Sequence, residues 1–318
     1  MSSALACTET QSPANAPGKH QPCFRKATIA MFAYNEEAAI RESVHSALAA
    51  GRRRFAAEDV NVVVMANGCT DRTADCVRDM SHSNPAVQVH ELTVGDKATT
   101  WNWYVHEFAD LTSDDHLHLF MDGDVTCTEN VVQSMVDALV QLPTANACCV
   151  LPAISVGRNR GLNERLYEVD GAIFGNLYGL TNTFLKRIRD AKIRIPAGAV
   201  GEDAYVTEMV ALDLDRNNTY DNRKAACAHA DSGFIYRSLS YWNVADIRLQ
   251  LNRLVRYQIR DWRLPILRRV NFADFPDTMQ PIDQQILQQL HNKWLLHPIQ
   301  WLARRRLQRR ASTSFSKS

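Results

Sequence analysis

Short apolar runs alternate with amphipathic segments between residues 27 and 154, and this alternation constrains the fold more than any other feature. The apolar runs predict strands at 27–32, 60–66, 87–92, 116–121 and 147–154. A helix is predicted after each of the first four strands, the first one opening at Asn35 with this residue as its cap. Such alternation with short loops is typical of a mostly parallel sheet with helices on both faces. We therefore predict an α/β fold.

The alternation stops after residue 160, and the rest of the chain predicts mainly helices. The predicted elements are a helical segment at 161–190, a turn and helix at 198–214, and an edge strand within 217–230. A long amphipathic helix is expected to begin near residue 239. We divide the chain into a disordered lead (1–25), an α/β domain (26–235) and a helical, basic C-terminal region (236–318).

Composition excludes several classes of protein. Hydrophobic residues make up 46% of the chain and charged residues 22%, as expected for a soluble globular protein. No apolar run approaches the roughly 18 residues of a membrane span, and the N-terminus does not read as a secretory signal. The eight cysteines lack zinc-binding spacing, so we expect free thiols and a cytoplasmic protein.

The charge is divided unevenly along the chain. Residues 236–318 hold 15 basic and 5 acidic side chains, a net +10, so the remainder carries −9 within an overall charge of +1. A basic region attached to an acidic body indicates an anionic partner for the basic part. Nucleic acid, an anionic lipid surface and a phosphorylated acceptor all fit this charge.

The pentapeptide MDGDV at 121–125 follows the fourth predicted strand. Asp122 and Asp124 flank one glycine, and two carboxylates at this spacing can converge on one divalent cation that keeps positions for phosphate oxygens. The end of a strand is also where open α/β sheets bind ligands. The same residues suit an ordinary turn, in which an Asp side chain bonds its own backbone.

Four other segments lie at or near the ends of predicted strands: AYNEE at 33–37, ANGCTDRT at 66–73, GDKATTWN at 95–102 and AGAVGEDAYV at 197–206. The helix start after the first segment offers free backbone N–H groups to an anion, and Tyr34 could stack on a base. Lys97 opens a helix after a glycine, where it could reach a phosphate. In the last segment, two glycines precede Glu202 and Asp203, which either cap a helix or form a mobile loop that delivers a carboxylate.

The five motifs resemble those of family 2 glycosyltransferases of GT-A fold. NE follows the first strand, NGCTD the second, GxK precedes the third helix, DGD follows the fourth strand, and GED comes later, all in the order of that family. The likeness covers roughly residues 26–235. Beyond it, Gln250, Arg253, Arg256 and Tyr257 are similar to a degraded QxxRW motif.

The resemblance implies an inverting transferase that uses a nucleotide-sugar donor. It implies that Asp122 and Asp124 hold Mg²⁺ or Mn²⁺ against the donor diphosphate, and that Asp203 is the general base for the acceptor hydroxyl. Chemistry supports both roles, because a divalent cation offsets charge on the leaving group and a positioned carboxylate activates a poor nucleophile.

The remaining site residues are assigned by the same resemblance. Glu36 and Asn67 would border the base and ribose, and Lys97 would lie near the nucleotide. Arg253 and Arg256 are one turn apart and could clamp a phosphate, although an exposed basic helix face is the alternative.

Two positions depart from the family pattern or add to it. The family often has an aspartate where this chain has Ala66, and that aspartate commonly pairs with the uracil of a UDP-sugar. The alanine leaves GDP and other donors open. His229 follows a possible strand and could be a third metal ligand, or an ordinary core or surface histidine.

The C-terminal residues predict a helix that starts at His297-Pro298. Ile299, Leu302 and Ala303 would share one face, with arginines elsewhere and Trp294 and Trp301 nearby. This pattern fits an interfacial helix that meets anionic lipids, or a terminal helix packed on the body of the protein.

We therefore expect a metal-dependent glycosyltransferase that acts in polysaccharide or glycolipid biosynthesis. Its expected partners are a nucleotide-sugar donor and an acceptor glycan or lipid-linked acceptor, with no nucleic acid, and its expected location is peripheral on the inner face of the plasma membrane. A nucleotidyltransferase is one alternative, although AYNEE lacks the glycine-rich basic loop expected there. A catalytically inactive sugar-nucleotide-binding protein is the other.

Overall fold

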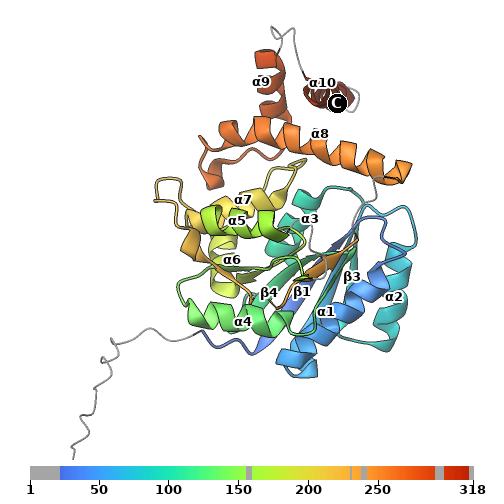
Figure 1. The fold of residues 1–318 in the computed structure, drawn as a ribbon, viewed down its shortest axis with the longest axis vertical. Coiled ribbons are helices and arrows are strands. Elements are labelled where there is room, and N and C mark those ends of the chain that lie inside the picture. Colours follow the sequence, from blue (N-terminus) through green and yellow to red (C-terminus); the bar gives the residue numbers. More distant parts are fainter. Residues whose placement is uncertain (1–21, 155–159, 230, 238–241, 291–296, 315–318) are drawn as a thin grey trace, which may run out of the picture.

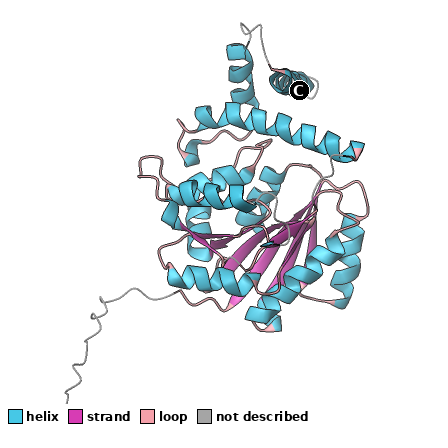
Figure 2. Cartoon of the chain, in the orientation of Figure 1, coloured by secondary structure: helices cyan, strands magenta, loops and turns pink. Residues whose placement is uncertain are grey.

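Seven strands form one mixed sheet in the computed structural model, which describes residues 22–154, 160–229, 231–237, 242–290 and 297–314 (Figures 1 and 2). The strand order is β3-β2-β1-β4-β7-β6-β8. The strands are β1 (Lys26–Ala33), β2 (Val60–Asn67), β3 (Val87–Leu92), β4 (His116–Asp122), β6 (Ala147–Cys149), β7 (Leu177–Thr181) and β8 (Ala225–Cys227). A second, antiparallel pair joins β5 (Val125–Cys127) to β9 (Phe234–Tyr236).

The first four strands of the sheet run parallel, which confirms the predicted α/β architecture. β1 pairs with β2 on one side and with β4 on the other, in a register that sets Ala33 opposite Ala66 and Phe32 opposite Asp122. The carboxyl ends of these strands therefore meet at one edge of the sheet. The disordered lead was predicted to end at residue 25, but Phe24 is already buried, and residues 1–21 lie outside the described part of the chain.

Strand β7 corrects the prediction of continuous helix at 161–190. Only α5 (Arg160–Asp170) and α6 (Asn182–Asp190) are helical there, and β7 between them pairs antiparallel with β4. Gly179 explains the close fit, because a Cβ at this position would lie 3.0 Å from Met135 and 3.1 Å from Leu119. The strand is too short for its pattern to be distinguished from a buried helical turn by periodicity alone.

The remaining helices are α1 (Ile40–Arg54), α2 (Thr73–Ser83), α3 (Lys97–Trp103), α4 (Val131–Gln141), α7 (Glu202–Ala211), α8 (Val244–Leu267), α9 (Gln280–Leu290) and α10 (Pro298–Ser314). Asn35 is not the cap of α1 as predicted. It takes a left-handed conformation with φ 58°, and the helix begins five residues later at Ile40. The helix predicted after the third strand is α3 followed by a π-helical turn at Tyr104–Phe108.

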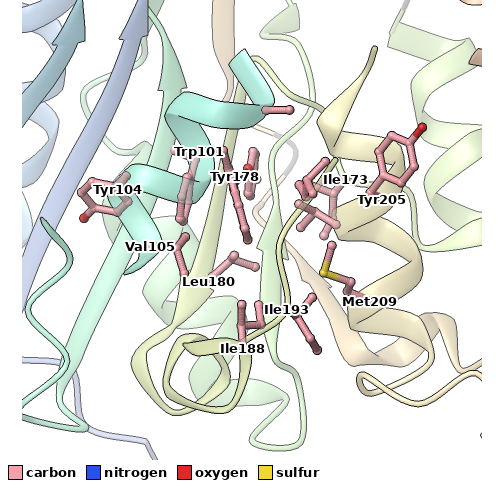
Figure 3. Close-up of a cluster of buried hydrophobic side chains, with 14 of the residues drawn as sticks. Trp101, Tyr104, Val105, Ile173, Tyr178, Leu180, Ile188, Ile193, Tyr205 and Met209 are labelled. Atoms are coloured by element: carbon pink, nitrogen blue, oxygen red, sulfur yellow. Dashed lines mark hydrogen bonds between the residues drawn. The ribbon is translucent and has the colours of Figure 1, made fainter. Parts of the chain in front are cut away.

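Apolar side chains fill both faces of the sheet. On one face the Trp101 indole donates a hydrogen bond of 2.9 Å to the Tyr178 hydroxyl, and Tyr178 stacks on Phe120 with ring centroids 4.9 Å apart (Figure 3). The same cluster continues through Ile259 of α8 and Leu307 of α10. The C-terminal helices therefore share a core with the α/β domain, and Figure 1 shows α8 lying across one end of that domain, with α9 and α10 beyond it.

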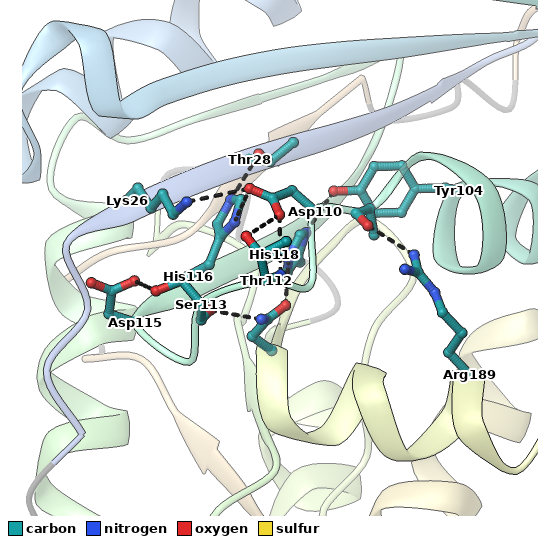
Figure 4. Close-up of polar contacts among 12 residues, drawn as sticks. Lys26, Thr28, Tyr104, Asp110, Thr112, Ser113, Asp115, His116, His118 and Arg189 are labelled. Atoms are coloured by element: carbon teal, nitrogen blue, oxygen red, sulfur yellow. Dashed lines mark hydrogen bonds and ion pairs between the residues drawn. The ribbon is translucent and has the colours of Figure 1, made fainter.

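The opposite edge of the sheet, where β1 and β4 begin, holds a buried polar network (Figure 4). His118 donates through Nε2 to the Asn182 carboxamide oxygen at 3.0 Å, because that oxygen can only accept. Its Nδ1 then accepts from the Tyr104 hydroxyl at 2.7 Å. Burial lowers the pKa of His118 to about 3, so the imidazole is neutral. This network braces the sheet far from the strand ends that carry the predicted site.

Candidate active site

Lys97 joins two carboxylates at the carboxyl edge of the sheet. It is the first residue of α3, and its Nζ lies 2.6 Å from Asp122 at the end of β4 and 2.5 Å from Glu202 at the start of α7. Burial alone would lower the pKa of Lys97, but the two carboxylates hold it well above its usual value. Burial raises the pKa of Asp122 to about 6, although Lys97 opposes this. The lysine therefore links the DGD and GED segments directly.

Asp203 lies beside this ion-pair group and is held by backbone N–H donors. Its Oδ2 accepts from the Gly175 N–H at 3.1 Å, and its Oδ1 from the Ala204 N–H at 3.0 Å. Burial and the charge of Glu202 raise the pKa of Asp203. Gly175 lets its backbone come this close, since a Cβ at this position would lie 3.3 Å from the carboxylate oxygens of both Asp203 and Glu202. A buried, oriented carboxylate of raised pKa is suited to accepting a proton.

Arg260 is a site residue that the sequence motifs did not single out. Gly201 adopts φ 71° just before α7, and a Cβ at this position would lie 3.3 Å from the Arg260 Nη1 and 3.2 Å from Asp203. Arg260 is therefore beside the Asp203 carboxylate, and its charge lowers the pKa of that group against the effect of burial. The arginine follows Arg256 by four residues and Arg253 by seven, a spacing that could have indicated one helix face.

The predicted phosphate-binding arginines Arg253 and Arg256 are exposed on α8, two turns and one turn before Arg260. With Arg260 they form a basic row that leads toward Asp203. Both side chains are accessible to a phosphate, but their exposure fits an ordinary solvated helix face equally well. Only Arg260, which also lies over the Tyr257 ring at 4.9 Å, is in contact with the site.

The charges of Asp122 and Asp124, the two residues predicted to hold a cation, act on a third carboxylate, that of Glu36. Asp124 is exposed on the turn after β4, and Gly123 before it fits against β1, where a Cβ would lie 2.8 Å from Ala33. The pKa of Glu36 is raised to about 7 by burial, and then by the charges of Asp124 and Asp122. Mutual repulsion of this kind is what a bound cation relieves.

The donor set fits a divalent cation that completes its shell with water and substrate oxygens. Across the described residues no group of three or more His, Cys, Asp and Glu side chains is arranged as a full metal site. His229 accordingly does not complete a set with Asp122 and Asp124 in that part of the chain. Its ring is exposed and lies 3.4 Å from Asp231, as expected for a surface histidine. Two carboxylates with open positions are typical of Mg²⁺ sites that bind phosphates.

Asn67 holds the loop before α3, and its contact with the nucleotide stays a prediction. Its buried side-chain oxygen accepts from the Asp96 N–H and from the Thr100 hydroxyl, both at 2.8 Å. Tyr34 is 55% exposed and its ring lies against Gly95, so one face is available for stacking. A small hollow at the ends of β2 and β3 is lined by Ala66, Asp71, Glu91 and neighbouring residues. Ala66 therefore borders a space at the position where the family often has an aspartate.

The glycine loop before α7 is tied down by a buried ion pair. Arg263 of α8 and Asp283 of α9 form two parallel bonds of 2.8 and 2.7 Å, and the Arg263 Nη1 donates to the Gly198 carbonyl at 2.7 Å. The Gly198 N–H donates to Asp96 at 3.1 Å. The loop that leads to Asp203 is thus bonded both to the start of α3 and to the C-terminal helices, and Glu202 and Asp203 lie in the first turn of α7, as in the helix-capping alternative.

The Arg263→Met substitution is expected to destabilise the protein by roughly 3–5 kcal/mol, because it leaves the buried Asp283 carboxylate unpaired. Urea unfolding measures the loss. The double variant Arg263→Met/Asp283→Leu should recover most of it, since no buried charge remains. As a control, Arg41→Met removes an exposed ion pair with Asp79 and should leave the unfolding midpoint nearly unchanged. A midpoint for Arg263→Met equal to that of the control would contradict the structural role of the pair.

Comparisons with known proteins find a family model and solved structures that are similar to this chain. The family model described as Glycosyl transferase family 2 matches residues 28–203. The mannosyltransferase PcManGT from Pyrobaculum calidifontis, solved with GDP-Man and Mn²⁺, is similar in structure with a TM-score of 0.53 and 15% identity, over 93% of this chain and 83% of that one. TarS 1–349 from S. aureus has a TM-score of 0.51 and 15% identity, over 84% and 72% of the two chains.

No curated protein matches the chain in sequence. At 15% identity the two solved structures show a shared fold, whereas the family model rests on the sequence itself. That model spans more than half of the 318 residues and includes every site segment from Tyr34 to Asp203. The chain therefore belongs to glycosyl transferase family 2.

Proposed function

We propose that this protein transfers a sugar from a nucleotide-sugar donor to an acceptor hydroxyl with inversion at the anomeric carbon. The observation that carries the proposal is the meeting of Asp122, Lys97 and Glu202 at the edge of the sheet, with Asp203 adjacent. Asp122 and Asp124 would face the cation, and the separate buried carboxylate of Asp203 would accept the proton. The closeness of these groups supports the proposal that one site supplies both requirements of the reaction.

Asp122 and Asp124 would hold Mg²⁺ or Mn²⁺, and Mn²⁺ is supported by the structure of PcManGT, which contains this ion. A bound divalent cation would offset the negative charge of the departing nucleoside diphosphate. Lys97 keeps the Asp122 carboxylate oriented through its bond of 2.6 Å. His229 remains the weaker proposal for a third ligand, because its ring is paired with Asp231.

Asp203 would act as the general base. As the acceptor oxygen forms its bond to the anomeric carbon, the bond from that carbon to the diphosphate oxygen breaks, and the hydroxyl proton passes to the Asp203 carboxylate. The two backbone hydrogen bonds to Asp203 fix its direction during this transfer. The pKa of Asp203 is raised toward neutral pH, and a general base is most effective when its pKa lies near the working pH.

The nucleotide would occupy the strand ends beside Tyr34, Glu36 and Asn67. Tyr34 offers a ring face to the base, and Asn67 acts through the loop that it holds. Arg253, Arg256 and Arg260 would bind phosphate oxygens of donor or acceptor, since guanidinium groups recognise them in pairs of hydrogen bonds. Ala66, at the place where the family often has an aspartate, leaves GDP and other donors open besides UDP.

The acceptor class and location follow from the basic C-terminal region. The acceptor would be a glycan or a lipid-linked acceptor in polysaccharide or glycolipid biosynthesis, and an anionic acceptor of this kind would fit the charge of +10. A peripheral position at the inner face of the plasma membrane belongs to the same proposal. None of the described helices combines the length and apolarity needed to cross a bilayer.

A thermal-shift screen of nucleoside diphosphates and their sugars tests the proposal. We expect one base to stabilise the protein in Mn²⁺ and not in chelator, by about 2.7 kcal/mol at a ligand concentration 100 times Kd. Nucleoside triphosphates with a sugar phosphate test the nucleotidyltransferase alternative through release of pyrophosphate. Stabilisation without any sugar transfer or donor hydrolysis would instead indicate an inactive binding protein. No stabilisation by any nucleotide would overturn the proposed function.

A further inference from the structure

The N-terminal half of α8 exposes apolar side chains along one side of the helix. Val244, Ile247, Leu251 and Leu254 recur at helical spacing, and 81% of the surface of Val244 is exposed. Trp242, 97% exposed, precedes them. We name these five residues the α8 stripe. By contrast, Val255 and Ile259 on the adjoining face are buried in the core. The stripe is therefore a second apolar face of α8, and this one is exposed.

On this part of α8 the exposed charges are all positive, with Arg248 nearest the stripe and Arg253 and Arg256 toward the other side of the helix. Between Trp242 and Tyr257 the charged residues are Asp246, Arg248, Arg253 and Arg256. The three arginines are exposed, whereas Asp246 is buried and paired with Arg237. An exposed apolar face on a helix whose exposed charges are arginines, with aromatic residues at both ends, is suited to the interface of an anionic bilayer. A second copy of the chain would set like charges against one another.

The terminal helix α10 is not the element that presents an apolar face. Ala303 and Leu307 are buried, and Ile299 and Leu302 pack against the same core. Arg306 of α10 donates to Asn252 of α8 at 2.8 Å, so the two helices are joined. Of the two readings of Ile299, Leu302 and Ala303, the structure supports the packed helix. Trp294 lies outside the described residues. α10 then contributes positive charge beside α8, while α8 supplies the apolar contact.

We propose that the α8 stripe docks on an anionic lipid surface and thereby holds the catalytic edge of the sheet at that surface. Arg260, beside Asp203, follows Leu254 by six residues, which is about 9 Å along a helix. The site would therefore lie within reach of lipid head groups. If the proposed function holds, this docking identifies the acceptor as a phosphorylated lipid or a glycan attached to one.

Vesicle co-sedimentation tests the docking. The wild-type protein is expected to bind phosphatidylglycerol vesicles and not phosphatidylcholine vesicles, with binding that weakens as salt rises. The Ile247→Ser/Leu251→Ser variant should partition about tenfold less, since two apolar side chains no longer enter the interface. The Arg248→Gln variant should bind these vesicles about fivefold less, because one positive charge is removed.

The matched control is Leu162→Ser/Leu166→Ser, which changes two exposed apolar residues on α5. It should bind vesicles as the wild type does, and all variants should keep the wild-type melting temperature because the changed residues are exposed. Equal binding by the α8 variant and the control, equal binding to both lipids, or dimerisation through α8 in sedimentation velocity would overturn the docking. Vesicle binding with no nucleotide binding would leave docking intact and refute the proposed function.

Discussion

Asp203→Asn is expected to lower kcat by roughly 10²–10⁴-fold while binding of the donor persists. The amide cannot accept the acceptor proton, yet it keeps nearly the size of the carboxylate. It can satisfy only one of the two N–H donors, from Gly175 and Ala204, that the carboxylate satisfies now. The substitution should therefore lower the turnover number strongly and the stability of the protein only slightly.

Steady-state rates at saturating donor, with thermal shift by the nucleoside diphosphate in Mn²⁺, measure both expectations. A general base acts in its ionised form, so wild-type activity should rise with pH and then level off. Because burial and Glu202 raise the pKa of Asp203, this rise should lie above the usual range of an aspartate. The variant should lack it. Asp114→Asn, an exposed residue paired with Lys186, is the control. Near-normal turnover in Asp203→Asn would remove this residue from the mechanism.

The sheet and the position of its site could be predicted because local signals agree there. β-branched runs such as VNVVVMA at 60–66 have few alternatives to a buried strand, and short loops then require parallel neighbours. Once strands β1, β2 and β4 are parallel, their carboxyl ends meet. Asp122 and Lys97 were thus predicted near one another without any knowledge of their contact.

Other features depend on contacts that the sequence pattern does not carry. Strand β7 gains its place from Gly179 fitting against Leu119 across the sheet, which five residues of sequence do not reveal. Glu202 reads as a helix-capping acid until Lys97 is seen to bind it. Arg260 is one of several arginines on α8, and only the turn at Gly201 sets it apart. Each miss concerns a partner distant in the chain.

Asp124→Asn is expected to abolish Mn²⁺-dependent nucleotide binding and sugar transfer. Asp124 is exposed on its turn, so its carboxylate contributes to the site mainly as a ligand and a charge. Without it, one of the two protein ligands is lost, and the repulsion that helps raise the pKa of Glu36 is reduced. The melting temperature of the metal-free protein should change little.

Asp122→Asn provides the sharpest comparison, because Asp122 also binds Lys97 at 2.6 Å. Its loss should lower the melting temperature even without metal, since Lys97 keeps only Glu202 as a charged partner. Asp231→Asn, beside His229, serves as a control for an exposed aspartate and should retain Mn²⁺-dependent stabilisation. If Asp124→Asn is stabilised by nucleotide and Mn²⁺ as the wild type is, the cation is bound without Asp124. A loss in Asp231→Asn instead would move the metal site toward His229.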